Sequence, residues 1–269
     1  MKRLNFAALV AAVISSLILV SCGSVPLTGR KQILLVSDQE VFEAGLTQYK
    51  AYMSEAQVST DAGRTALVKK VGSRLSDATE RYLRANGFES EISNLKWEFN
   101  LVKNPEVNAF CLPGGKIVVY EGLFAIAQTE AELAVVLGHE IGHAVAKHSN
   151  ERMSQQILAQ YGMAILSSAL SEKSTAVQSV ATSVFGLGAQ VGLMLPYSRK
   201  HEYEADYMGL VFMEIAGYDS ESALTFWKKM SSGSSSSSDF LSTHPSDSKR
   251  IAAIDSRISE ARGVAQTLK

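Results

Sequence analysis

Apolar residues recur every three or four positions along much of the chain, as expected when one face of a helix is buried. Ser37 with Glu40, and Thr129 with Glu132, form capping boxes that mark helix starts. Thr60 is a further expected cap, and Gly217 is an expected helix end. The pattern predicts helices over about 37–53, 60–86, 129–148, 198–217, 219–230 and 246–262.

A second pattern, alternation of apolar and polar residues, predicts a strand over 97–102. Residues 108–112 and 116–120 are mostly apolar and flank Pro-Gly-Gly, which favours two strands joined by a tight turn. Helices predominate over these strands, so the expected class is α+β, mostly α.

The segment 153–195 is apolar enough to raise the question of a membrane. Ser, Gln and Gly interrupt both of its halves before they reach the roughly 20 apolar residues of a spanning helix. We expect a soluble helical hairpin that covers the functional site. The alternative is an interfacial hairpin that dips into a membrane.

The predicted helix after Thr129 carries His139, Glu140 and His143 in the pattern His-Glu-x-x-His. Residues four apart share a helix face, so both imidazoles can bind one zinc ion. Glu140 can then act as general base toward a zinc-bound water. Polar residues in an otherwise apolar helix would be costly unless ligated or paired, which favours a metal site over a solvated helix.

A catalytic zinc site needs a third protein ligand and one open position. In the metzincin spacing that ligand would be a His at position 149, which is Ser149 here. On a continuous helix His148 points away from His139, so we expect a surface or secondary polar residue there. Glu202 and Asp206 share a helix face. Glu202 is therefore the expected ligand, and Asp206 the acceptor for a ligating imidazole's other nitrogen.

Composition narrows the classes of function. A chain of 269 residues, 46% hydrophobic and 20% charged, suits a globular protein with a substantial core. The net charge of −1 and the lack of a basic cluster argue against nucleic-acid binding.

The first 21 residues form a targeting segment, in which Lys2 and Arg3 precede a mostly apolar run. That run ends Leu-Val-Ser-Cys22, which resembles the bacterial lipoprotein box. The resemblance implies that Cys22 is lipidated and becomes the N-terminus, with Gly23 favouring the outer membrane. The alternatives are an ordinary signal peptide and a short signal anchor. Cys111 would then have no cysteine partner in the chain.

Four motifs occur in order: Asn108-Ala-Phe-Cys-Leu-Pro-Gly-Gly115, His139-Glu-Ile-Gly-His143, Ser198-Arg-Lys-His-Glu202-Tyr-Glu-Ala-Asp206 and Thr243-His244-Pro245. Together they resemble the zinc metallopeptidase family of HtpX and the CAAX prenyl endopeptidase, peptidase family M48. Thr28-Gly-Arg-Lys-Gln32 resembles the opening of its lipoprotein and periplasmic members, such as LoiP and BepA. The similarity covers about residues 25–262, although Cys111 stands where Ala is common and the transmembrane helices of HtpX are not evident.

The resemblance implies a zincin (gluzincin) fold with one zinc ion per chain, bound by His139, His143 and Glu202, with Glu140 as base and Asp206 behind the ligands. It also implies catalytic roles for His244, a mobile residue near the metal, and for Arg250, its basic partner. In some relatives the matching His occupies the open zinc position and keeps the enzyme latent. The strand residues Asn108, Ala109, Phe110, Cys111 and Leu112 either bind an extended substrate or simply support the metal helix.

The expected function is that of a zinc endopeptidase that degrades unfolded or misfolded proteins of the bacterial envelope. It would be held by Cys22 at the outer membrane, facing the periplasm, with an envelope-assembly partner. One alternative is a lipoprotein chaperone or assembly factor that keeps zinc for stability, although such a protein has no use for Glu140. Another is a different zinc hydrolase, such as an esterase. The expected domains are a signal peptide over 1–21, a membrane tether over 22–36, a peptidase domain over 37–262 and a tail over 263–269.

Overall fold

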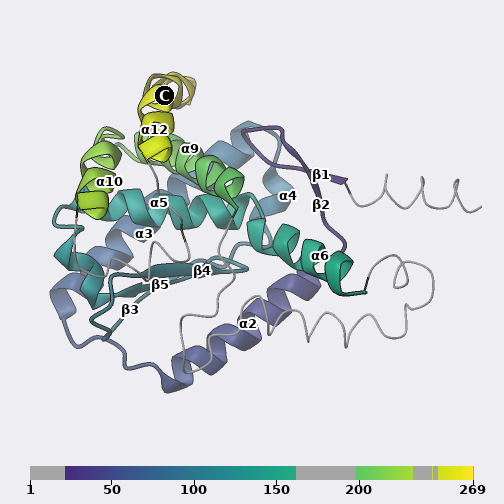
Figure 1. The fold of residues 1–269 in the computed structure, drawn as a ribbon, viewed down its shortest axis with the longest axis horizontal. Helices are drawn as coiled ribbons and strands as arrows, with labels where there is room; N and C mark the ends of the chain where they lie inside the picture. Colours follow the sequence, from purple (N-terminus) through teal and green to yellow (C-terminus); the bar gives the residue numbers. More distant parts are fainter. Residues whose placement is uncertain (1–21, 162–197, 233–243, 245–247, 269) are drawn as a thin grey trace, which may run out of the picture.

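The computed structural model describes residues 22–161, 198–232, 244 and 248–268, and its helices surround a small sheet (Figure 1). Strands β3 (Glu98–Val102), β5 (Lys116–Tyr120) and β4 (Ala109–Leu112) lie in the order β3-β5-β4. β3 is parallel to β5, and β4 is antiparallel to β5. The turn between β4 and β5 contains Gly114 and Gly115, both at positive φ, where glycine carries no steric penalty. The predicted strands and the α+β, mostly helical class are confirmed.

The sheet is covered on both faces, because successive side chains of a strand point to opposite sides. Ala109 and Val119 belong to a core with α3 (Ala62–Ala85) and α5 (Glu130–Val145). Phe110 and Val118 belong to a second core with α2 (Asp38–Glu55) and α6 (His148–Tyr161). In Figure 1, α3 and α5 lie on one side of the sheet and α2 on the other. This double burial explains why β4 and β5 are continuously apolar in sequence.

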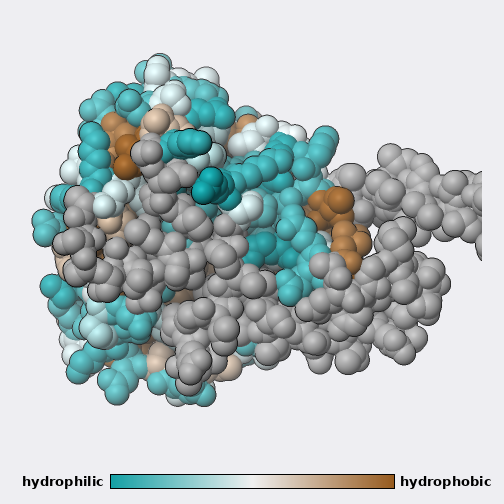
Figure 2. Space-filling model, in the orientation of Figure 1, coloured by the Kyte–Doolittle hydropathy of each residue, from teal (hydrophilic) through white to brown (hydrophobic). Residues whose placement is uncertain are grey.

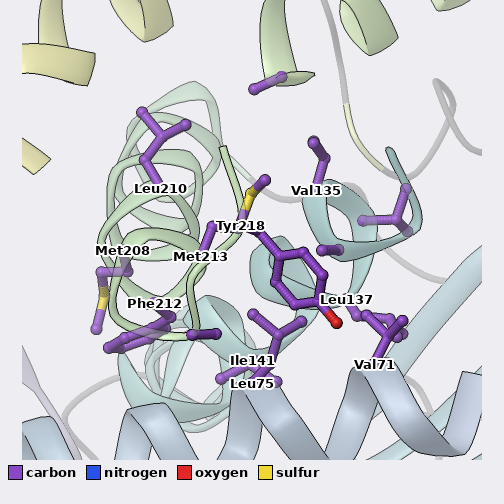
Figure 3. Close-up of a cluster of buried hydrophobic side chains, with 14 of the residues drawn as sticks. Val71, Leu75, Val135, Leu137, Ile141, Met208, Leu210, Phe212, Met213 and Tyr218 are labelled. Atoms are coloured by element: carbon purple, nitrogen blue, oxygen red, sulfur yellow. The ribbon is translucent and has the colours of Figure 1, made fainter. Parts of the chain in front are cut away.

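Helices α5 and α9 (Arg199–Ile215) pack against each other with almost no space between their backbones. A Cβ on Gly142 would lie 2.7 Å from the Ala205 carbonyl oxygen, and one on Gly138 would lie 3.2 Å from that of Gly209. Figure 3 shows apolar side chains of both helices packed above α3. The close crossing places residues 139–143 beside residues 202–206.

Most predicted helix boundaries agree with the structure. Both capping boxes are present, at Ser37 and Thr129. The cap of α3 is Asp61 rather than Thr60, because the Asp61 carboxylate accepts the Arg64 N–H. The remaining helices are α4 (Glu89–Ile92), η1 (Glu121–Ala125), α10 (Ser222–Ser232) and α12 (Ser248–Gln266). Helix α12 extends beyond the expected end at Arg262 to Gln266 and buries Ala265, so the first residues of the expected tail are helical.

The expected tether is also part of the fold. β1 (Cys22–Ser24) pairs antiparallel with β2 (Lys31–Ile33), and Val25 is fully buried beside this hairpin. Arg30 forms ion pairs with Glu151 of α6 and Glu204 of α9. These contacts hold this segment against the domain, while its expected role as a membrane tether stays a prediction.

Helix α5 does not continue to His148 as expected. Lys147 has a φ of 55°, which breaks the helix, and α6 begins at His148. Within the described ranges, no helix is long and apolar enough to cross a membrane. Most of the predicted hairpin over 153–195, like the targeting segment 1–21, lies outside the described residues.

Candidate active site

Helix α5 directs His139 and His143 toward one point in the interior. Their Nε2 atoms lie 3.0 Å apart, and both residues are almost fully buried. The two imidazoles meet because residues four apart lie one above the other on a helix. The predicted pair of imidazoles is therefore present.

Helix α9 contributes two carboxylates to the same point. Glu202 Oε1 lies 3.3 Å from His143 Nε2, and Glu202 Oε2 lies 3.4 Å from His139 Nε2. Asp206 Oδ1 lies 2.9 Å from the other nitrogen of His139, Nδ1. The structure places these carboxylates where the sequence predicts a ligand and its supporting acceptor.

His244 completes the group. Its Nδ1 lies 3.1 Å from His139 Nε2 and 3.2 Å from Glu202 Oε1, and its Nε2 lies 3.4 Å from Glu140 Oε1. It is 2% exposed, so it faces the cluster rather than solvent.

The four side chains fit a zinc ion. Each of His139, His143, Glu202 and His244 offers one atom, and the four atoms lie within 4.8 Å of one another. Neighbouring atoms are 3.0 to 3.4 Å apart. Two ligands about 2.0–2.1 Å from a tetrahedral zinc ion would be about 3.3–3.4 Å apart. Imidazole nitrogens and a carboxylate oxygen are also the donors that zinc prefers.

The charges of the site favour a cation at its centre. Burial lowers the pKa of His139, but the Glu202 and Asp206 carboxylates outweigh burial and raise that pKa to about 9. Burial and the neighbouring His139 hold the pKa of His143 well below its ordinary value, so this imidazole is neutral. A neutral imidazole has the lone pair that a metal requires.

Arg250 joins the two carboxylates from α12. Its Nη1 lies 2.8 Å from Glu202 Oε2, and its Nε lies 2.6 Å from Asp206 Oδ2. The guanidinium lies over the ring of Trp227, 3.7 Å from the centroid. Arg250 was predicted as a basic partner of His244, and it donates to the His244 carbonyl at 3.4 Å, but its stronger contacts are with the carboxylates.

Glu140 is buried with one oxygen, Oε1, that has no hydrogen-bond partner in the described part of the chain. Burial raises the pKa of this carboxyl group. An unsatisfied buried acceptor is costly, so we expect a donor at Oε1, either a water molecule or the imidazole of His244, whose Nε2 lies 3.4 Å away.

Strand β4 is buried next to Glu140, and one edge of its backbone is not paired with β5. The Tyr120 N–H donates to the Asn108 carbonyl, so Phe110 and Leu112 make the hydrogen-bonded pairs with β5. The backbone groups of Ala109 and Cys111 therefore point away from β5. The Cys111 backbone makes a hydrogen bond with Glu140, and the Asn108 side chain accepts the Ala109 N–H.

A second buried polar cluster, behind His143, is not evident in the sequence. It contains His148, Glu204, Arg30, Glu151 and His201. His148 is fully buried, whereas a surface position was one of the two expected from the sequence. The break in the helix at Lys147 turns the His148 side chain back toward His143. A left-handed residue other than Gly or Asn leaves no clear mark in a sequence.

The chain matches the model of peptidase family M48 over residues 71–258. It is 42% identical over 168 residues to the mitochondrial metalloendopeptidase OMA1 of Arabidopsis thaliana, covering 62% of this chain and 33% of the relative. It is 30% identical over 250 residues to the mitochondrial metalloendopeptidase OMA1 of Homo sapiens. That match covers 88% of this chain and 46% of the relative. It is also 29% identical over 171 residues to the beta-barrel assembly-enhancing protease of Escherichia coli K12. That match covers 62% of this chain and 35% of the relative. The chain thus spans a third to about half of the length of these relatives.

Proposed function

The chain belongs to peptidase family M48, and from this premise we propose that it is a zinc endopeptidase of the bacterial envelope that cleaves unfolded or misassembled proteins. The observation that carries the proposal is the buried group of His139, His143 and Glu202 with Glu140 beside it. A metal kept only for stability needs ligands but no general base.

The residues of the chain divide the reaction between them. Zinc held by His139, His143 and Glu202 would polarise the peptide carbonyl and lower the pKa of the attacking water. Glu140 would accept the proton of that water at Oε1, which makes no hydrogen bond within the described residues, and would then donate it to the leaving amine. Asp206 holds His139 by accepting its Nδ1–H.

The substrate class follows from strand β4. An extended peptide can pair with the outward-facing carbonyl groups of Ala109 and Cys111 and so lie beside Glu140, although the N–H of Ala109 is bonded to Asn108 and the Cys111 backbone to Glu140. Such pairing favours a peptide over the ester of another zinc hydrolase. It also favours unfolded chains, because only an extended segment offers a free edge for pairing.

The proposed location rests on the sequence around Cys22. Leu-Val-Ser-Cys resembles a lipoprotein box, as in lipoprotein members of the family, and one relative is named for β-barrel assembly. We expect Cys22→Ala to release the protein from membranes. If this variant still sediments with membranes after a salt wash, the lipoprotein assignment is wrong.

The decisive test of the activity compares the wild-type protein with Glu140→Gln, which preserves side-chain size but cannot take a proton. Both should contain equal zinc, while Glu140→Gln should cleave unfolded β-barrel proteins about a hundredfold more slowly or worse. Equal cleavage by both would exclude Glu140 as base. Zinc without cleavage in either protein, together with protection of the barrel proteins from aggregation, would indicate the chaperone or assembly factor instead.

A further inference from the structure

The imidazole of His143 is backed by a chain of buried groups that ends at the N-terminal hairpin. His143 Nδ1 lies 2.8 Å from His148 Nδ1, and His148 Nε2 lies 2.9 Å from Glu204 Oε2. Glu204 in turn accepts hydrogen bonds from Thr28 Oγ1 and, at 2.7 Å, from Arg30 Nε. His143 and His148 are at most 2% exposed, so water does not compete for these contacts.

The direction of each hydrogen bond in this chain follows from metal binding. A metal at Nε2 of His143 leaves the ring proton on Nδ1, so His143 must be the donor. His148 must then accept with Nδ1, which leaves its own proton on Nε2, facing the Glu204 carboxylate. Each atom thus has one role, and each donor meets an acceptor.

We propose that His148 is a positioning residue of the metal site, which fixes the ring of His143 and is itself fixed by Glu204 and the hairpin residues Thr28 and Arg30. The inference rests on the metal site of the proposed function. It gives His143 the same kind of support that His139 receives directly from Asp206. In both cases the final acceptor is a carboxylate of α9.

The hairpin is needed because the chain of contacts ends on a carboxylate that is largely removed from water. Arg30 lies between Glu204 and Glu151, with 2.7 Å contacts to both, and Glu151 also contacts His201 at 3.1 Å. A buried carboxylate without a cation would be strongly unfavourable. The structure therefore assigns residues 28–30 to the support of the metal site rather than to a linker.

Two substitutions of His148 separate positioning from simple packing. An Asn amide oxygen replaces Nδ1 and can still accept from His143, whereas a Gln amide nitrogen replaces Nε2 and can only donate to Glu204. In the full chain, His148→Gln should weaken zinc binding about 10–100-fold. His148→Asn keeps the acceptor for His143 and loses only the contact with Glu204, so it should bind zinc more tightly than His148→Gln and less tightly than the wild-type protein. Affinity is measured with zinc alone, by competition with a chromophoric chelator.

Cobalt(II) provides a second readout that does not depend on activity. The visible absorption bands of the cobalt-loaded protein should change more in His148→Gln than in His148→Asn, because the bands report the geometry of the ligands. Equal zinc affinities for the two variants, whether both unchanged or both equally weakened, would overturn the proposal.

Two controls keep the result interpretable if a variant folds poorly. Glu204→Gln keeps an acceptor for His148 in a residue of the same size, so it should lose less zinc affinity than His148→Gln. Lys116→Met breaks the Lys116–Glu98 ion pair on the side of the sheet that faces α2, so it should lower stability without changing zinc affinity. A loss of affinity in Lys116→Met equal to that in His148→Gln would refute positioning. A wild-type chain that binds no zinc would overturn the proposed function as well.

Discussion

Arg250 and Asp206 form a bidentate ion pair in the interior of the protein. Arg250 Nε lies 2.6 Å from Asp206 Oδ2, and Nη2 lies 2.8 Å from Oδ1. The same guanidinium reaches Glu202 at 2.8 Å, and Arg250 is 1% exposed. One cation from α12 therefore compensates two carboxylates of α9.

Removing this cation should destabilise the protein strongly. Arg250→Met leaves Asp206 and Glu202 buried without their cation, which we expect to cost about 3–5 kcal/mol of unfolding free energy. Chemical denaturation of the zinc-free protein measures this loss.

Arg257→Met is the matched control on the same helix. Arg257 is about half-exposed, pairs with Glu260 and lies over the ring of Tyr207. Arg257→Met should lower the unfolding free energy by about 1 kcal/mol or less. Equal losses for the two variants would contradict the buried role of Arg250.

Metal content should depend on Glu202 as it does on His139. Glu202→Ala and His139→Ala each remove one atom of the buried group, so both should emerge from gel filtration without zinc, whereas Glu140→Gln should retain it. Atomic emission gives the zinc per chain. Full zinc content in Glu202→Ala would remove Glu202 from the ligands.

His244 should restrain the activity of the resting protein. Its Nδ1 lies as close to His139 and Glu202 as a fourth ligand would, in the position that a catalytic site keeps open. Substrate must then displace His244. We expect His244→Ala to cleave small flexible peptides faster than the wild-type protein, with zinc still bound. Slower cleavage of every substrate would instead indicate stabilisation of the oxyanion, and unchanged rates would remove both roles.

The carboxylates of Glu151 and Glu204 should make the stability of the protein sensitive to acid. Burial raises the pKa of Glu151 and Glu204, but the hydrogen bonds from His201 and His148, followed by those from Arg30, outweigh burial and lower both pKa values to about 2. Because the folded pKa lies below the unfolded value, the stabilisation is complete above about pH 4.5 and is lost as the pH falls toward 2.

Glu151→Gln tests this window. The difference in unfolding free energy between the wild-type protein and Glu151→Gln should be largest above about pH 5 and should shrink steadily as the pH falls to about 2. Glu89→Gln changes an exposed carboxylate and is the control. Its unfolding free energy should differ little from that of the wild-type protein at every pH. A constant difference for Glu151→Gln would contradict the assigned pKa. The measurement uses zinc-free protein, because acid also releases metal.

Local signals in the sequence predicted much of the fold and part of the site. The capping boxes, the Gly-Gly turn and the spacing of apolar residues depend on neighbours within a few positions, and these elements form as predicted. His139 and His143 share a helix face for the same reason. Their partners Glu202 and Asp206 could be predicted because helix spacing and family resemblance agreed.

Contacts between distant segments were decided only by tertiary structure. His148 was predicted to lie away from the site, since a single left-handed residue, Lys147, redirects the chain in a way that no local pattern indicates. Arg30 lies in a segment expected to be a tether, yet it meets Glu151 and Glu204 more than a hundred residues away. Periodicity reports which face of an element is buried, whereas the pairing of buried charges depends on how whole elements cross. That crossing, set here by glycines of α5 against α9, is a property of the packed molecule.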